Sequence, residues 1–132
     1  MRRAGINEVP MAKLRHIAIC VQDLEKSASF YEEVFGMTRA HVEHQEIGSA
    51  IYLTDGVVNL ALIRAKQPVR EHFGFIVDDL EATQRRIEEQ GGKYAFTLGH
   101  PERKNFEMKF TDPEGRIFDI SRHGWFGAQS ES

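Results

Sequence analysis

An internal repeat constrains the fold of this chain more than any other feature of its sequence. The segment LRHIAICVQDLEKSASFYEEVFG, residues 14–36, matches REHFGFIVDDLEATQRRIEEQGG, residues 70–92, at a constant offset of 56 positions. That offset superposes His16 on His72 and the glycine that ends the first segment on the one that ends the second. Self-similarity at one fixed offset indicates two similar structural modules in tandem.

Both modules predict the same order of elements: a strand, a helix and three more strands. Each module opens with a short apolar run rich in Ile, Val and Phe, which is typical of a buried strand. An aspartate, Asp23 or Asp79, then stands at the N-cap position of an amphipathic helix that ends at glycine. The period of the apolar residues afterwards changes towards two, and turns at 54–56 and 112–115 separate predicted strands.

The two modules are expected to form one domain, because a unit of about 55 residues is marginally stable alone and needs a shared core. We place module one at 14–66 and module two at 70–122. The residues 1–13 are interpreted as an N-terminal extension, and 123–132 as a C-terminal tail.

Composition excludes several classes of function. The formal net charge of −3 argues against a nucleic-acid-binding protein, which needs a basic face. No apolar run approaches the roughly 20 residues that cross a bilayer, and the first ten residues lack the apolar stretch of a signal peptide. We therefore expect a cytoplasmic protein with no membrane partner. The single cysteine, Cys20, excludes an intrachain disulfide.

The repeat also selects candidate ligands of a metal ion. Among six histidines, His16 and His72 hold equivalent places in the first strand of each module. Asp119 lies in the apolar strand RIFDIS, and Asn59 is aligned with it in VVNLALI. A carboxylate in such a strand needs a cation, a hydrogen-bond network or water. Two imidazoles and one carboxylate suit a divalent metal with open positions; the alternative is a buried hydrogen-bonded cluster without metal.

The region from about residue 14 to residue 122 resembles the vicinal oxygen chelate superfamily. That superfamily includes glyoxalase I, extradiol dioxygenases, methylmalonyl-CoA epimerase, and fosfomycin- and bleomycin-resistance proteins. The resemblance rests on LRHIAICVQDLEKSASFYEEVFGM, EHFGFIVDDLEATQRRIEEQGG and FTDPEGRIFDIS. It implies an α+β fold in which two tandem βαβββ modules form a curved, half-open mixed sheet barrel around a cavity. It also implies metal ligands from the first and last strands of each module, at the places of His16, Asn59, His72 and Asp119.

Two departures from the family pattern concern the metal. Glyoxalase I usually carries Glu or Gln at the place of Asn59, so the resemblance leaves His16, His72 and Asp119 as the expected ligands. Asp119 stands where most members carry Glu, and the missing methylene shortens its reach by about 1.5 Å. The strand must then shift, or a water must bridge, for metal to bind. The implied cofactor is a divalent ion: Fe²⁺, Mn²⁺, Ni²⁺ or Zn²⁺.

The resemblance implies a metalloenzyme that binds a small-molecule substrate through oxygen atoms. Dioxygenase-like chemistry is favoured by the three-ligand set and by the spacing of the D-P-x-G turn. His100, which precedes that turn, is the candidate general acid or base, and the alternative interpretation is an exposed loop histidine. The alternatives are a glyoxalase-like lyase or isomerase, a thiol transferase, and a non-catalytic ligand-binding protein of the bleomycin-resistance type. Related short chains commonly pair, so a homodimer is expected, with the site within one chain or between subunits.

Other side chains are candidates for contact with the substrate or for support of the ligands. Tyr52 and Phe75 either line the cavity or fill the core, and the core is favoured. Trp125, in the tail, either closes the mouth of the cavity or packs at a dimer contact. Glu107 faces either solvent or the cavity. The candidates for substrate contact or ligand support are Asn59, Tyr52, Phe75, Lys109 and His123.

Overall fold

The computed structural model describes residues 12–46, 48–66, 69–100, 102 and 106–127, so most of the predicted N-terminal extension and the end of the tail lie outside the described residues. The helices of the described part of the chain have 12 and 10 residues, and neither is long enough to cross a membrane. The elements are β1 (Lys13–Cys20), α1 (Leu24–Phe35), β2 (Thr38–Gln45), β3 (Gly48–Thr54), β4 (Asn59–Ala65), β5 (His72–Ile76), α2 (Leu80–Glu89), β6 (Lys93–Leu98), β7 (Glu107–Thr111) and β8 (Ile117–Ser121).

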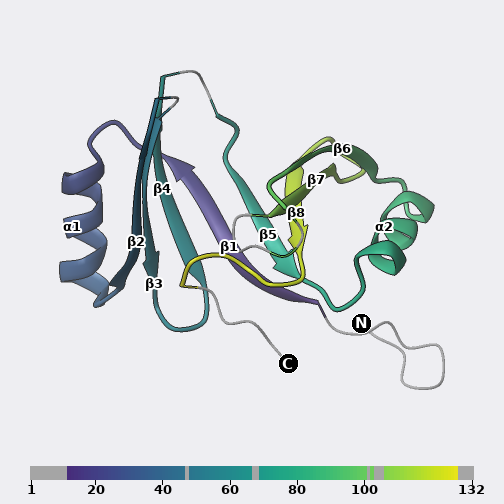
Figure 1. Cartoon of the computed structure of the whole chain (residues 1–132), viewed down its shortest axis with the longest axis horizontal. Coiled ribbons are helices and arrows are strands. Elements are labelled where there is room, and N and C mark those ends of the chain that lie inside the picture. Colours follow the sequence, from purple (N-terminus) through teal and green to yellow (C-terminus); the bar gives the residue numbers. More distant parts are fainter. Residues whose placement is uncertain (1–11, 47, 67–68, 101, 103–105, 128–132) are drawn as a thin grey trace.

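The eight strands of the described residues form one mixed sheet. Their order is β2-β3-β4-β1-β5-β8-β7-β6, so each module contributes four neighbouring strands. The modules join where β1 pairs with β5 in antiparallel orientation. The sheet is open, with β2 and β6 at its edges, and the two helices lie at opposite ends of the molecule (Figure 1). This architecture confirms the predicted α+β fold of two βαβββ modules.

Each helix covers an apolar cluster of its own module, which leaves the junction between the modules free to carry polar groups. The fully buried Ala28 of α1 packs on residues of β3 and β4, and Leu80 and Ile87 of α2 pack on residues of β7 and β8. The buried members are Ala28, Ile51, Leu53 and Leu62 in module one, and Val77, Phe110 and Ile120 in module two.

Both helices begin at the predicted aspartate caps. The side chains of Asp23 and Asp79 each accept a hydrogen bond of 3.0 Å from the backbone N–H three residues further along. The first helix ends at Gly36, whose φ of 72° is the left-handed conformation that glycine adopts without a steric cost. The second helix ends at Glu89, before its glycines. Gln90 takes the C-cap position, and Gly91 is the residue that has a positive φ.

The last strands of the two modules differ in register. In module one, Asn59 of β4 lies opposite His16 of β1. In module two, Asp119 of β8 lies opposite Gly74, two positions after the histidine of the repeat. By position in the sheet, the counterpart of Asp119 is therefore Ala61. The alignment of Asn59 with Asp119 from sequence is wrong by two residues, because one polar residue in an apolar strand does not fix the register of that strand.

We expect Asp23→Ala and Asp79→Ala each to lower the free energy of unfolding by about 1 kcal/mol, because each change leaves a backbone N–H of the first turn without its acceptor. Urea unfolding at pH 7, followed by far-UV circular dichroism, measures the difference. Asp78→Ala is the matched control, since Asp78 is an exposed carboxylate beside the cap, and it should change the value by less than about 0.5 kcal/mol. Equal losses for Asp78→Ala and Asp79→Ala would contradict the capping role.

Candidate metal centre

A row of paired residues crosses the middle of the sheet and positions the candidate site. Each residue of the row is the register partner of the next across four pairs of strands, β4/β1, β1/β5, β5/β8 and β8/β7. The row runs through Asn59, His16, Gly74, Asp119 and Lys109. Directly paired residues share a face of a sheet, and the alternation along β5 puts His72 on the face of Gly74. The pairing therefore gathers groups from both modules on one face.

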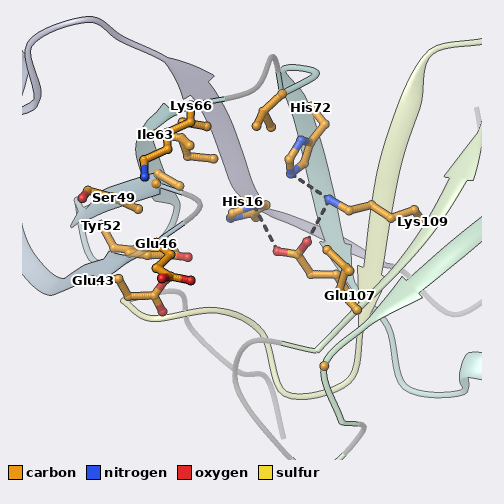
Figure 2. A pocket seen from close by; sticks show the side chains of 17 residues that line it. His16, Glu43, Glu46, Ser49, Tyr52, Ile63, Lys66, His72, Glu107 and Lys109 are labelled. Atoms are coloured by element: carbon orange, nitrogen blue, oxygen red, sulfur yellow. Dashed lines mark hydrogen bonds and ion pairs between the residues drawn. The ribbon is translucent and has the colours of Figure 1, made fainter.

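Four potential metal ligands converge on this face. One ligand atom from each of His16, His72, Glu107 and Asp119 lies within 4.8 Å of all the others. Nε2 of His72 is 3.1 Å from Oδ2 of Asp119, and Nε2 of His16 is 3.8 Å from a carboxylate oxygen of both Glu107 and Asp119. Figure 2 shows His16, His72 and Glu107 directed toward a common point. The three ligands expected from sequence thus meet within one chain, and Asp119 reaches them despite its shorter side chain.

Hydrogen bonds on the far side of each ring orient both imidazoles. Nδ1 of His16 lies 2.9 Å from Oδ1 of Asn59, whose amide nitrogen donates to the carbonyl oxygen of Phe126. Because that nitrogen faces Phe126, the amide oxygen faces His16 and accepts a hydrogen bond from Nδ1–H. Nδ1 of His72 likewise donates to the carbonyl oxygen of Arg70 at 2.8 Å. With its proton on Nδ1, each ring presents the lone pair of Nε2 to the cluster when the ring is neutral, as a metal ligand must.

Burial and charge oppose each other at these groups. Burial is the largest influence on His16 and holds its pKa below the ordinary value, against the charges of Glu107 and Asp119, so the ring is neutral at pH 7. Burial also acts to lower the pKa of His72, but the hydrogen bond and charge of Asp119 outweigh it and raise that pKa. For Asp119, burial acts to raise the pKa, whereas His72 and Lys109 together lower it, so the carboxylate is ionised at neutral pH.

The donor set fits a divalent cation. Nε2 of the buried His16 has no hydrogen-bond partner among the described residues, and the oxygens of Asp119 lie 3.1 Å from Nε2 of His72 and 2.8 Å from Nζ of Lys109. Imidazole nitrogens and carboxylate oxygens are the ligands that Mn²⁺, Fe²⁺, Ni²⁺ and Zn²⁺ take in proteins. Two ligands on opposite sides of one ion lie up to about 4.4 Å apart for bonds of about 2.2 Å. The cluster therefore needs only a small contraction to hold an ion.

Trp125 forms one wall of the cluster. Its indole stacks on the ring of His16, with centroids 4.4 Å apart and planes 12° from parallel, and its Nε1 donates to Oε2 of Glu107 at 2.9 Å. The indole fits there because Gly74 lacks a side chain: a Cβ at that position would lie 2.8 Å from the indole and 3.1 Å from Cβ of Asp119. The tail thus returns Trp125 to the interior, where the side chain is 1% exposed.

A cavity of about 890 Å³ opens beside the cluster. This volume lies within the range of sites that bind small molecules. His16, His72, Glu107 and Lys109 lie at one end, and the wall formed by module one carries Glu43, Glu46, Ser49 and Tyr52 (Figure 2). Burial, with the charges of Glu43 and Glu107, raises the pKa of Tyr52, so its phenol stays protonated and able to donate a hydrogen bond. The sequence favoured the core over the cavity for Tyr52, and that interpretation is wrong, because the side chain lines the cavity.

The remaining candidates from sequence do not line the cavity. Phe75 packs against the apolar core beneath α2, as the core interpretation expects. His100 is exposed, and its Nδ1 accepts a hydrogen bond of 3.2 Å from the backbone N–H of Glu102. His123 is half-buried in the turn after β8. None of these three belongs to the described residues that line the cavity.

Sequence reasoning left the place of Glu107 open between solvent and cavity. Glu107 and Lys109 alternate with apolar residues along β7, which puts both on one face of the sheet. The pairing of Lys109 with Asp119 identifies that face as the one that carries the site. The alternation along β7 can be recognised in the sequence, but the pairing of β7 with β8, which shows that this face carries the site, cannot.

Gly74→Ala is expected to displace the indole of Trp125, because the added Cβ would stand 2.8 Å from it. Trp125 is the single tryptophan of the chain, so its emission reports on the site, and we expect a shift to longer wavelength in the folded protein. Gly115→Ala is the control: its φ of +87° makes alanine strained, but its Cβ would meet nothing within 4 Å. An unchanged emission spectrum in folded Gly74→Ala would refute the proposed packing.

Comparisons with known proteins show relatives by sequence and by fold. The chain is 31% identical over 120 residues to the glutathione transferase FosA of Serratia marcescens. The matched region covers 83% of this chain and 80% of FosA. Its fold is similar to that of Streptomyces coelicolor methylmalonyl-CoA epimerase, at a TM-score of 0.64 and 19% identity over 82% of this chain and 94% of that one. A variant of 4-hydroxymandelate synthase from Streptomyces coelicolor gives a TM-score of 0.69 at 18% identity, over 92% of this chain and 52% of that one. The family model matches residues 13–120, and the chain belongs to the Glyoxalase/Bleomycin resistance protein/Dioxygenase superfamily.

Proposed function

We propose that this chain is a divalent-metal-dependent enzyme that binds a small substrate through oxygen atoms. The observation that carries the proposal is the convergence of His16, His72, Glu107 and Asp119 beside a cavity of about 890 Å³. An ion held by groups at the edge of a cavity keeps coordination positions that substrate oxygens can reach. Metal dependence also accounts for the buried Nε2 of His16 that has no partner among the described residues.

The proposal assigns His16, His72 and Asp119 as the residues that hold the ion. When bound, the ion supplies Lewis acidity toward substrate oxygens or, as Fe²⁺, access to dioxygen chemistry. Asn59 keeps His16 in the tautomer that ligation needs, and Trp125 excludes water from one side of the cluster. The neutral phenol of Tyr52 is a hydrogen-bond donor for a substrate oxygen in the cavity.

Dioxygenase-like chemistry, favoured by the sequence, requires that Glu107 stays off the ion so that open positions remain. One contact supports this arrangement, because Nε1 of Trp125 donates to Oε2 of Glu107 at 2.9 Å. Two histidines and one carboxylate then form the ligand inventory of non-haem Fe²⁺ oxygenases.

Thiol transfer is the second candidate reaction. The support is the identity of 31% with a glutathione transferase, which extends over about four fifths of both chains. Two assays separate the candidates: oxygen consumption with vicinal diols after Fe²⁺ loading, and loss of free glutathione thiol with electrophilic substrates after Mn²⁺ loading. Turnover in one assay and not in the other selects the reaction class.

Protein purified without chelator or affinity metal is expected to contain close to one equivalent of a divalent metal by elemental analysis. His72→Ala and Asp119→Ala should lose it, because each removes a ligand from the cluster. His44→Ala and Asp78→Ala, which remove an exposed imidazole and an exposed carboxylate elsewhere, should retain it. Wild-type protein that holds no metal and takes up none of Fe²⁺, Mn²⁺, Ni²⁺ or Zn²⁺ would sink the proposal and favour a non-catalytic ligand-binding protein.

Asn59→Leu should weaken metal binding by about 10- to 100-fold, because loss of the amide oxygen frees Nδ1 of His16 and its tautomer. Competition with a chromogenic chelator measures the affinity. Asn59→Asp, which keeps an acceptor for Nδ1–H, should bind more tightly than Asn59→Leu. Equal affinities of Asn59→Leu and wild type would show that this hydrogen bond does not position the ligand.

The role of His100 as general acid or base stays a prediction, as do the homodimer and the cytoplasmic location. His100 is exposed in this structure, and we expect His100→Ala to keep its metal. Sedimentation of the purified chain measures its oligomeric state.

A further inference from the structure

Lys109 carries a positive charge into the middle of the candidate metal centre. Its side chain is buried, and Nζ lies 2.8 Å from Oε1 of Glu107, 2.8 Å from Oδ1 of Asp119 and 3.2 Å from Nε2 of His72. The ammonium group thus contacts three of the four groups that are available to a metal ion, and Figure 2 shows it reaching across to His72 and Glu107.

The sheet directs Lys109 to this place. Lys109 is the register partner of Asp119, so the two side chains emerge side by side on the same face. The next residue along β7, Phe110, is completely buried in the core beneath α2, on the opposite face. Lys109 cannot leave the site by a shift of β7, because that shift would expose Phe110.

A divalent ion alone balances the charges of the centre, whereas Lys109 alone leaves one negative charge and both cations together leave one positive charge. Glu107 and Asp119 contribute two negative charges when ionised, and Lys109 contributes one positive charge. A divalent ion alone would neutralise the two carboxylates, whereas a divalent ion beside the ammonium group would leave an excess positive charge in a buried site. Lys109 and the ion also seek the same lone pairs on His72 and Asp119.

We propose that Lys109 is a built-in counter-ion of the centre, which holds the ligands together in the absence of metal and which an incoming ion must displace. The side chain therefore sets how tightly the centre binds a divalent metal. This inference rests on the proposed metal-dependent function. It extends that function by naming the residue that limits metal affinity.

The test compares the full-length wild type with Lys109→Met and Lys109→Arg. Methionine keeps an unbranched side chain without the charge, and arginine keeps the charge. We expect Lys109→Met to bind Zn²⁺ and Mn²⁺ more tightly than wild type by about tenfold or more, because the competing charge is gone. Lys109→Arg should not bind more tightly than wild type. Lys93→Met, which removes an exposed lysine of β6, is the matched control and should leave the affinity unchanged.

A second measurement addresses the metal-free state directly. In excess EDTA, Lys109→Met should unfold at a lower temperature than wild type, because Glu107 and Asp119 lose the cation between them. Adding Asp119→Asn to Lys109→Met should recover part of that loss, since one of the two unpaired charges is then removed. An unfolding temperature of Lys109→Met equal to that of wild type would overturn the counter-ion role.

The binding outcomes separate this inference from the proposed function. If wild type and Lys109→Met bind metal with equal affinity, the inference fails and the proposed function stands. If Lys109→Met binds metal and wild type does not, the inference holds and the proposed function of the wild-type chain fails. If neither binds metal, both fail.

Discussion

The antiparallel pairing of β1 with β5 is the contact on which the candidate site depends. It sets His16 opposite Gly74 and His72 opposite Ala18, so the two histidines of the repeat lie diagonally on one face, with ring centroids 5.4 Å apart. A slip of one residue would turn one strand over and send its imidazole to the other face. The C-terminal tail secures the same junction, because it leaves β8 of module two and its residue Gly127 accepts a hydrogen bond of 2.7 Å from Thr54 of module one.

The polar groups at this junction are better explained by function than by stability. An ionised carboxylate, a lysine and an imidazole are buried together, and the removal of such groups from water is costly unless all of them are paired. Apolar residues in the same row would join the two modules at a lower cost. The chain keeps its apolar clusters beneath the helices instead, where they stabilise each module and leave the junction to the charged groups.

Local signals in the sequence were sufficient for the modules, the helix caps and the histidine pair. The offset that superposes His16 on His72 also indicates that both residues belong to the first strand of a module. The caps at Asp23 and Asp79 depend only on contacts within the first turn of each helix. The rest depended on pairing between distant strands. Trp125 reaches the site only because the tail folds back over Gly74, and no short-range pattern reports that contact. The contacts of Lys109 required the register of β7 on β8.

The different registers of β4 and β8 give the two copies of the duplicated unit different tasks. Ala61 of module one occupies the place that Asp119 occupies in module two, and Ala61 lines the cavity. A carboxylate at that place would fill the space through which a ligand approaches the cluster and would add a further negative charge to it. Module two thus provides both carboxylates of the cluster, and module one provides open space beside them, although the two modules share one order of elements.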